Sequence, residues 1–364
     1  MIKYCYIHIP FCNKICSYCD FCKMLNYDKF VDKYLDALER EIKTIYKGDM
    51  LDTIYIGGGT PSSLNIKQLE KLFKILNKFN KNKNIEYTIE CNFESTDKDK
   101  ILLFKKYGIN RLSFGVETTS KKYLKLLDRS LDKDKVEEVL KDAKDLGFNN
   151  INVDLMYAFE NEKLKELEED IDYLLSLDVK HISTYSLIIE DHTILGIKKI
   201  KNVEDDVDLE MYKYICKRLK DNNYIHYEIS NFSKEGYYSR HNSSYWANEN
   251  YYGFGLGASS YIENRRTINT RSLNNYIDER YPREIEYLTK EDTMEYELIL
   301  NLRRKEGIDL NNFKDKYGIP LCEVYNYNKM LSLGLLKEED NHLFIPEDKW
   351  YINNYILSSI LVGE

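Results

Sequence analysis

Four cysteines lie close together near the start of the chain, in the segment Cys12-Asn-Lys-Ile-Cys16-Ser-Tyr-Cys19-Asp-Phe-Cys22. Three thiolates at spacings of four and three residues can wrap one [4Fe-4S] cube, which leaves the fourth iron open to a small chelating molecule. Zinc is the alternative, because it needs four ligands, often as two cysteine pairs. We expect a cluster on Cys12, Cys16 and Cys19. Cys22 could replace one of these ligands or have a second role, and we expect it to be inert or auxiliary.

Further candidate residues lie where apolar segments end. The glycines of Gly57-Gly58-Gly59-Thr60-Pro61 let the backbone approach a ligand closely, although a plain tight turn would also use them. Glu90 could accept hydrogen bonds from ribose hydroxyls, or it could be a surface charge. Arg129 offers a planar fork of donors suited to a carboxylate. Asp154 stands in an apolar segment, where an unpaired charge is costly. For Arg129 and Asp154, a structural salt bridge is the alternative.

The composition of the whole chain limits the classes of function. Its 364 residues are enough for one large and one smaller folded unit. The contents of 43% hydrophobic and 31% charged residues are ordinary for a soluble globular protein. The formal net charge of -8 gives no basic surface for nucleic acid. The sequence shows neither a signal peptide nor an apolar run long enough for a membrane span. We therefore expect a cytoplasmic protein, in which clustered cysteines indicate metal binding or catalysis rather than disulfides. The scattered cysteines are predicted to be small core residues: Cys5, Cys91, Cys216 and Cys322.

Strands and helices alternate over the first 230 residues. Short, mostly apolar segments predict strands at 3–8, 52–56, 86–90, 111–114, 151–155, 181–187 and 225–229. Helical spacing of apolar residues predicts helices at 28–47, 67–79, 133–146, 164–177 and 208–221. This alternation predicts a parallel sheet, either a barrel or partial barrel or a doubly wound sheet, with chemistry at the carboxyl ends of its strands. After about residue 235 the pattern changes to a polar, tyrosine-rich stretch, then short helices and a strand at 342–345.

The segment Tyr6-Ile-His-Ile-Pro-Phe-Cys-x3-Cys-x2-Cys resembles radical S-adenosylmethionine (SAM) proteins of the oxygen-independent coproporphyrinogen III oxidase family. Matching motifs recur in order along nearly the whole chain. The resemblance implies an α/β fold, with a partial (β/α)6 TIM-like barrel at residues 1–235. A smaller helical, winged-helix-like domain at 236–364 would cover the open mouth of the barrel.

The same resemblance implies cofactors and their contacts. A [4Fe-4S] cluster on Cys12, Cys16 and Cys19 would bind SAM as its exchangeable ligand. If the family mechanism holds, an electron donor such as flavodoxin or ferredoxin drives reductive cleavage of SAM. The implied SAM contacts are Tyr6, Tyr18, Gly58, Gly59, Thr60, Glu90, Glu117, Arg129, Asp154 and Ile188.

The family has two branches with different functions. An enzyme branch oxidatively decarboxylates two propionates of coproporphyrinogen III, and a heme chaperone branch binds heme and passes it to acceptor proteins. The enzyme branch has an N-terminal extension before its first cluster cysteine and ends the motif with Cys-x-Cys. Here Cys12 lies near the start and Phe21 replaces the last cysteine. We predict a heme chaperone. The alternatives are a coproporphyrinogen III oxidase, a radical SAM enzyme acting on an unknown substrate, or a member that keeps the cluster but has lost radical chemistry.

The segment His241-Asn242-Ser-Ser-Tyr245-Trp246 resembles the heme-associated motif of the chaperone branch. Imidazole is a common axial ligand of heme iron, so His241 is the candidate ligand. Tyr245 and Trp246 could pack on a porphyrin face. Alternatively, these side chains anchor the junction between the two domains by burying aromatic area. The sequence does not identify the heme acceptor.

The sequence departs from the family pattern at several positions near the expected substrate. Glu117 stands in Gly-Val-Glu-Thr-Thr, where the family has glutamine, which adds a negative charge beside the cofactor. The loop Tyr157-Ala-Phe-Glu-Asn161 lacks the usual glycine and proline residues, so its shape is expected to differ. The usual Arg-x-His is Arg129-Ser-Leu, and the usual Gly-Ala-His-Ser is Gly257-Ala-Ser-Ser. These changes suggest a divergent member, with the possibility of a different ligand.

Overall fold

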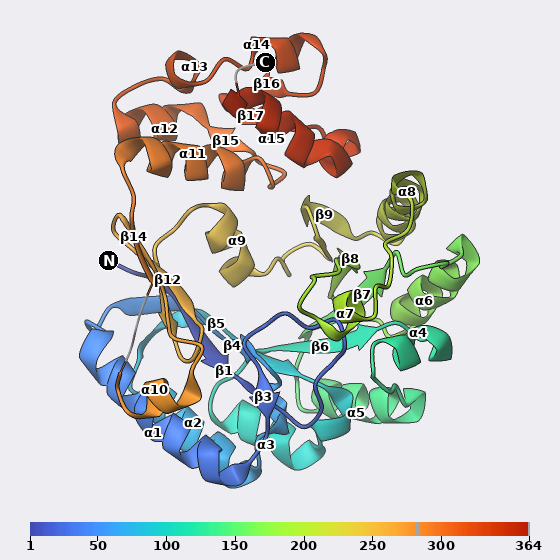
Figure 1. The fold of residues 1–364 in the computed structure, drawn as a ribbon, viewed down its shortest axis with the longest axis vertical. Helices are drawn as coiled ribbons and strands as arrows, with labels where there is room; N and C mark the ends of the chain where they lie inside the picture. The colour runs from blue at the N-terminus through green and yellow to red at the C-terminus, as the bar shows by residue number, and fades with distance from the viewer. Residues whose placement is uncertain (281–283, 363–364) are drawn as a thin grey trace.

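A twelve-stranded sheet dominates the computed structural model, which describes residues 1–280 and 284–362. Its strand order is β14-β13-β12-β11-β1-β4-β5-β6-β7-β8-β10-β9 (Figure 1). The six central strands are parallel: β1 (Tyr4–Ile9), β4 (Met50–Gly58), β5 (Asn80–Cys91), β6 (Arg111–Glu117), β7 (Asn150–Tyr157) and β8 (His181–Ser186). The sheet curves without pairing its two edge strands, which confirms the predicted partial (β/α)6 barrel.

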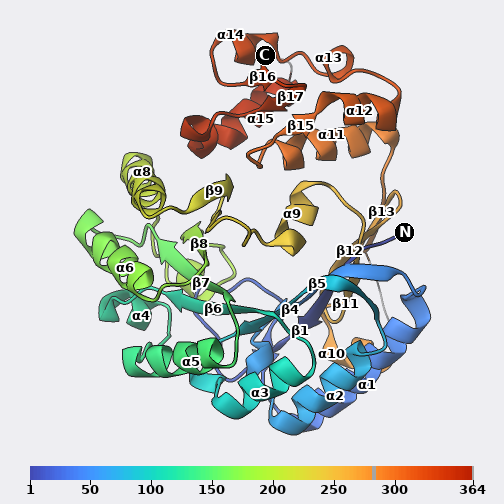
Figure 2. The ribbon, with the colours of Figure 1, turned by 180° about the vertical axis from the view of Figure 1, so that it is seen from behind.

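Helices cover the outer face of the curved sheet (Figures 1 and 2). The long ones are α1 (Asp28–Ile45), α2 (Ile66–Leu76), α3 (Lys98–Lys106), α5 (Lys133–Asp145), α6 (Leu164–Ser176) and α8 (Asp205–Asp221). Shorter ones are α4 (Lys121–Leu126), α7 (Ile194–Ile197) and the 3-10 turns η1 (Pro61–Ser63) and η2 (Phe93–Ser95). In α1 the predicted apolar face is buried, including Val31, Leu35 and Leu38. Burial of this face fixes the helix against the sheet.

The two edges of the sheet differ from the predicted strand–helix alternation. Predicted strand 225–229 forms as β9 (Ile225–Glu228), but it pairs with β10 (Asn231–Ser233), which runs antiparallel to β8. On the opposite edge, β11 (Tyr251–Phe254) pairs with β1 in parallel. The antiparallel strands β12 (Ser259–Ile262), β13 (Arg265–Ile268) and β14 (Glu284–Tyr287) then extend the sheet. The barrel sheet therefore includes residues beyond 235. The connecting helices are α9 (Arg240–Trp246) and α10 (Leu273–Ile277).

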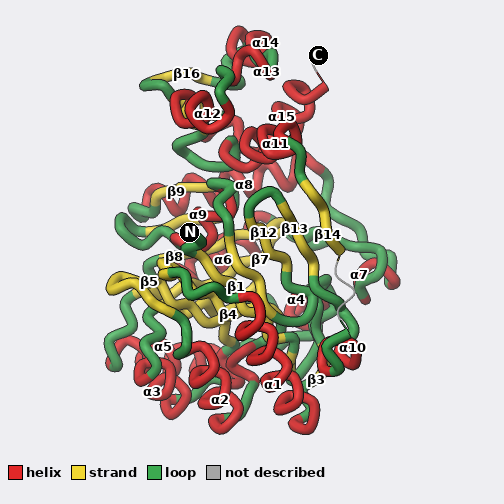
Figure 3. The backbone as a smooth tube through the Cα atoms, turned by 90° about the vertical axis from the view of Figure 1, so that its left-hand side faces the viewer, coloured by secondary structure: helices red, strands yellow, loops and turns green. Residues whose placement is uncertain are grey.

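A second hydrophobic core begins at Met294, and Leu298, Phe313 and Trp350 lie at its centre. Its elements are α11 (Lys290–Asn301), β15 (Ile308–Asp309), α12 (Leu310–Tyr317), α13 (Leu321–Val324), α14 (Asn328–Ser332), β16 (Lys337–Glu339), β17 (His342–Phe344), η3 (Glu347–Ile352) and α15 (Asn353–Val362). The predicted strand at 342–345 corresponds to β17, which forms the antiparallel wing with β16. Figure 3 shows this unit stacked on one end of the barrel part.

The C-terminal unit contacts β9 and the region around α8 and α9. The backbone N–H of Ile229 donates to the carbonyl of Arg303 at 3.1 Å, and that of Lys305 donates to the carbonyl of Tyr227 at 3.1 Å. Across residues 1–280 and 284–362, no helix is both long and apolar enough to cross a membrane.

Candidate functional site

The cysteine loop joins β1 to α1 and is held at both ends. The two-residue strands β2 (Phe11–Cys12) and β3 (Met24–Leu25) pair in parallel and close it. In its middle, the backbone N–H of Ser17 donates to the carbonyl of Leu127 at 3.0 Å. Cys12, Cys16 and Cys19 line one pocket. Burial raises the pKa of all three thiols, that of Cys12 to about 11, and a negative charge on Cys16 or Cys19 would raise the pKa of Cys12 further. The three sulfurs are therefore electrostatic neighbours.

Cys22 lies outside this pocket. A Cβ atom built on Gly257 would come within 3.1 Å of Cys22 Sγ, so this thiol faces the segment after β11. The carbonyl of Cys22 accepts a hydrogen bond from His8 Nε2 at 2.7 Å. Because Nε2 carries the proton, Nδ1 of His8 accepts from the Tyr6 hydroxyl at 3.0 Å. Tyr6 therefore supports the end of the cysteine loop through His8 and does not line the pocket.

The glycine segment packs against the cysteine loop without room for side chains. A Cβ atom on Gly59 would lie 2.8 Å from the carbonyl oxygen of Phe11 and 2.9 Å from Cys12 Sγ. Gly58 has φ +115° and a Cβ there would lie 2.6 Å from the His8 ring. Glycine is required at both positions because the two loops approach so closely. This contact places the backbone of the glycine segment beside the Cys12 sulfur.

Two carboxylates, Glu90 and Asp154, lie on strands β5 and β7, on either side of β6. Glu90, at the end of β5, accepts hydrogen bonds from the Gly58 backbone N–H at 2.9 Å and from the Tyr55 hydroxyl at 2.8 Å. Asp154 on β7 accepts one from Asn152 Nδ2 at 2.8 Å. Burial raises the pKa of both groups, that of Asp154 to about 6, and the charge of Glu90 raises the pKa of Asp154 further. Both are oriented acceptors in the barrel interior.

Glu117 and Arg129 form an ion pair at the same end of the barrel. Arg129 Nη1 lies 3.2 Å from Glu117 Oε1, and Nη2 donates to the carbonyl of Gly115 at 3.0 Å. Arg129 Nη1 also lies 3.9 Å from Cys16 Sγ, and the Tyr18 hydroxyl donates to Glu117 Oε1 at 3.1 Å. Arg129 is thus placed between a carboxylate and a cysteine sulfur.

These groups line a single cavity of about 500 Å³, which we call the strand-end pocket. The predicted residues that line it are Cys12, Cys16, Tyr18, Cys19, Gly58, Gly59, Thr60, Glu90, Glu117, Arg129, Asp154 and Ile188. None of the described lining residues lies beyond Glu190. The C-terminal unit, which was expected to cover the open mouth of the barrel, contributes no described residue to this lining and contacts β9 and α9.

Sequence reasoning missed several residues of this pocket. Ser113 and Met156 line it, and Met156 lies two positions after the predicted residue Asp154. Alternation along a strand places such neighbours on the same face, so this signal was available. Tyr185 on β8 also lines the pocket. At the rim, Phe21 and Ile188 are 68% and 71% exposed and form an apolar border.

The segment predicted to bind heme lies elsewhere, on α9. His241 is buried, its Nδ1 pairs with Thr53 Oγ1 at 2.6 Å and its Nε2 with the Tyr245 hydroxyl at 2.8 Å. Its ring stacks on Tyr55, with centroids 5.1 Å apart. Trp246 donates to Glu228, and its ring lies 5.7 Å from the Arg303 guanidinium. In this arrangement neither imidazole nitrogen of His241 is free. Asn242 donates its backbone N–H to Ser239 Oγ at 3.3 Å.

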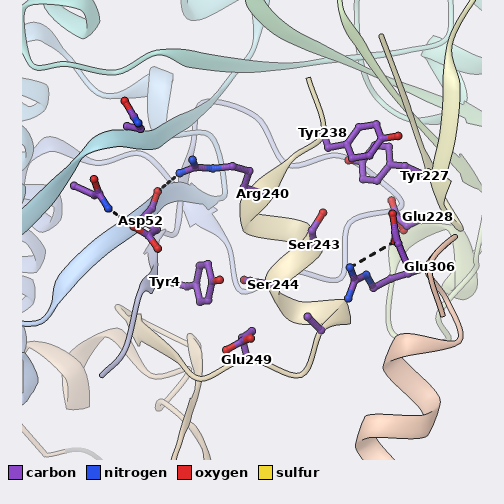
Figure 4. Close-up of a pocket in the computed structure, with 14 residues that line it drawn as sticks. Tyr4, Asp52, Tyr227, Glu228, Tyr238, Arg240, Ser243, Ser244, Glu249 and Glu306 are labelled. Atoms are coloured by element: carbon purple, nitrogen blue, oxygen red, sulfur yellow. Dashed lines mark hydrogen bonds and ion pairs between the residues drawn. The ribbon is translucent and has the colours of Figure 1, made fainter. Parts of the chain in front are cut away.

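A second cavity, of about 590 Å³, lies beside α9, and we call it the α9 cavity. Figure 4 shows its polar lining, with Tyr227 and Tyr238 face to face on one side and Asp52 and Arg240 on the other. It shares no lining residue with the strand-end pocket. The α9 cavity and the strand-end pocket are therefore separate cavities.

The strand-end pocket fits a [4Fe-4S] cluster with SAM. Its three cysteines leave one iron of a cube without a protein ligand. The glycine cradle, the acceptors Glu90 and Asp154 and the donor Arg129 suit an amino group, ribose hydroxyls and a carboxylate. Among the described residues, no three His, Cys, Asp or Glu side chains form a group that could hold a single metal ion.

Comparison with known proteins shows the family. The model of the radical SAM superfamily matches residues 6–174, and that of the HemN C-terminal domain matches residues 288–348. Heme chaperone HemW of Bacillus subtilis is 36% identical over 99% of both chains. Heme chaperone HemW of Lactococcus lactis is 33% identical over 99% of this chain and 97% of its own.

A solved structure shares the fold. Coproporphyrinogen III oxidase (HemN) from Escherichia coli aligns with a TM-score of 0.85 at 22% identity, over 98% of this chain and 89% of that one. Radical SAM membership implies a [4Fe-4S] cluster and SAM as cofactors. Because the identity to the Bacillus subtilis protein extends over the whole chain, this protein belongs to the HemW heme chaperone family of the radical SAM superfamily.

Proposed function

We propose that this protein is a heme chaperone that holds a [4Fe-4S] cluster on Cys12, Cys16 and Cys19 and binds SAM beside it. The binding of these two cofactors is supported by one observation: the three cysteines line the same pocket as Glu90, Arg129 and other predicted SAM residues. The chaperone part is supported by the full-length similarity to two proteins named heme chaperone HemW. It is also supported by Phe21, which stands where the enzyme branch has a cysteine.

Each side chain of the pocket has a distinct role in this proposal. The backbone of Gly58, Gly59 and Thr60 lies against the methionine amino group, and Arg129 faces the methionine carboxylate. Glu90 and Asp154 accept hydrogen bonds from the ribose hydroxyls. Smaller contributions come from Tyr18, Glu117 and Ile188, and Tyr6 acts through His8. When bound, the reduced cluster would supply one electron to the sulfonium of SAM. We propose a cytoplasmic location with flavodoxin or ferredoxin as the electron donor.

The proposed heme contacts are His241, Asn242, Tyr245 and Trp246 on α9. Because both nitrogens of His241 are hydrogen-bonded inside the barrel, ligation of heme iron by this residue requires α9 to move outward. The hydroxyl of Tyr245 is the group that iron would displace at Nε2. The same contacts also anchor α9 between the barrel and the C-terminal unit, which was the alternative role for the segment.

Oxidation of coproporphyrinogen III is the second candidate function. The fold shared with the Escherichia coli oxidase favours it. At 22% identity this similarity concerns the fold, so the chaperone function has the stronger support.

The test uses one anaerobic preparation with a reconstituted cluster, divided between a heme titration and a coproporphyrinogen assay. We expect stoichiometric heme binding without porphyrinogen turnover. His241→Ala should lose heme binding. Tyr245→Phe, which frees Nε2 while keeping the ring, should bind heme at least as tightly as the wild type. Turnover without stable heme binding would refute the chaperone function. Heme binding that is retained in both variants would instead indicate that α9 has only an anchoring role.

A further inference from the structure

A continuous series of buried hydrogen bonds crosses the barrel from the strand-end pocket to α9. Asp154 Oδ1 lies 2.8 Å from Asn152 Nδ2, and Asn152 Oδ1 lies 2.6 Å from His181 Nδ1. His181 Nε2 lies 2.7 Å from the Tyr227 hydroxyl, which accepts from the backbone N–H of Ser239 at 3.1 Å. The four residues that follow Asp154 in this series, from Asn152 to Ser239, are each at most 3% exposed. Ser239 is the residue that caps the amino end of α9.

The direction of every hydrogen bond in this series follows from its neighbours. Two hydrogens on Asn152 Nδ2 serve Asp154 and Ser113 Oγ, because a flipped amide would turn its oxygen toward the Asp154 carboxylate. Asn152 Oδ1 is then an acceptor, so His181 carries its proton on Nδ1. Burial lowers the pKa of His181, which keeps the ring neutral, so Nε2 must accept from Tyr227. All donors therefore point toward Asp154.

The proton positions from Ser239 to Asp154 follow one direction along the series. Ser183 Oγ lies 3.1 Å from Asn152 Oδ1 and is also a hydrogen-bond partner of Asp154, so it supports the same end of the series. If one group moved away, a buried donor or acceptor would be left without a partner, which is costly in a dry interior. The position of the Asp154 carboxylate is therefore tied to Tyr227 and to the start of α9.

We propose that Tyr227 and His181 are positioning residues for the ribose site at Asp154, and that they tie the position of α9 to SAM binding. The inference rests on the proposed contact between Asp154 and SAM. Because coupling between two sites is reciprocal, SAM binding stabilises α9 to the same extent that an ordered α9 favours SAM binding. The segment 241–246, proposed for heme, is thus held most firmly when SAM is present.

Tyr227→Phe and Tyr238→Phe form a matched pair of variants. The two rings stack with centroids 4.3 Å apart, and both line the α9 cavity (Figure 4). Within the described part of the chain the Tyr238 hydroxyl makes no hydrogen bond, whereas that of Tyr227 donates to His181. Each variant keeps the ring and removes one hydroxyl, so only Tyr227→Phe breaks the series.

The experiment measures SAM affinity and amide hydrogen exchange in the cluster-loaded protein. We expect Tyr227→Phe to bind SAM roughly threefold to tenfold more weakly, with Tyr238→Phe like the wild type. SAM should slow exchange in the peptide covering residues 239–246 of the wild type and of Tyr238→Phe, and should slow it less in Tyr227→Phe. The wild-type exchange result holds even if a variant is poorly folded.

Two outcomes would overturn the inference alone: equal SAM affinity and equal protection in Tyr227→Phe, or SAM binding by the wild type with no change in exchange at 239–246. A wild type that carries its cluster but binds no SAM would overturn the proposed cofactor site, and this inference with it.

Discussion

Arg129 Nη1 lies 3.2 Å from Glu117 Oε1 and 3.9 Å from Cys16 Sγ, so one guanidinium is shared by a carboxylate and a cysteine. The two charged side chains are only 14% and 8% exposed. Glu117 has φ +65°, and the resemblance described above leads one to expect glutamine at this position. The proposed carboxylate of SAM must therefore compete with Glu117 for Arg129.

Replacing Glu117 with Gln should tighten SAM binding by about tenfold or less at pH 8, because the amide keeps the polar contacts and removes the competing charge. Burial raises the pKa of Glu117 to about 7, even though Arg129 opposes the rise. Wild-type affinity should accordingly increase as the pH falls from 8 to 7 and Glu117 becomes partly neutral, while that of Glu117→Gln stays nearly flat, because Asp154, with a pKa of about 6, remains mostly charged. Isothermal titration with SAM at both pH values checks this. Weaker binding by Glu117→Gln would show that the negative charge attracts the cationic part of SAM instead.

Gly58→Ala should destabilise the protein and impair SAM binding, because the added Cβ meets the His8 ring at 2.6 Å. Gly108→Ala is the matched control. Gly108 has φ +83° but no atom within 4 Å of its Cβ position. It should cost only the about 1–2 kcal/mol of a left-handed backbone at a residue with a Cβ. Urea unfolding gives the free energy of unfolding for each variant. Equal losses in the two variants would show that the close packing between Gly58 and His8 has no energetic role.

The stability of the cluster-free protein should depend on the protonation of His241. Burial lowers the pKa of His241 to about 3, well below its unfolded value of 6.5, so the neutral ring contributes its full stability above pH 6.5. This contribution is lost as the pH falls, by about 2 kcal/mol between pH 6.5 and pH 5. His241→Gln should remove that part of the acid dependence, measured by urea unfolding at the two pH values. An unchanged dependence in the variant would mean that His241 is not buried as a neutral ring.

The sequence predicts the parallel centre of the fold well and its edges poorly. Central strands such as β1 are mostly apolar segments, and the buried face of α1 repeats at helical spacing. By contrast, β13 and β14 are short, polar and largely exposed, so no alternation marks them. The reversal of β10 depends on the chain turning back after Glu228, which the apolar pattern of 225–229 does not reveal.

The same contrast holds for the site. Glu90 and Asp154 could be singled out because a carboxylate at the end of an apolar strand, or inside one, is conspicuous. The burial of His241 could not, since it depends on Thr53 and Glu86, which are far away in the sequence. The place of Cys22 outside the pocket is likewise set by distant residues, His8 and Gly257. Spacing within a motif indicates which residues are chemically able to act, and tertiary contacts decide which of them face the ligand.

The most direct test of the account is the electron paramagnetic resonance spectrum of the reduced, reconstituted protein, recorded with and without SAM for the wild type, Cys16→Ala and Cys22→Ala. Cys16 lines the strand-end pocket and Cys22 does not, although both belong to the same loop. The account predicts a cluster signal that SAM alters in the wild type and in Cys22→Ala, and loss of the cluster in Cys16→Ala. A cluster that survives in Cys16→Ala, or one that is lost in Cys22→Ala, would contradict it.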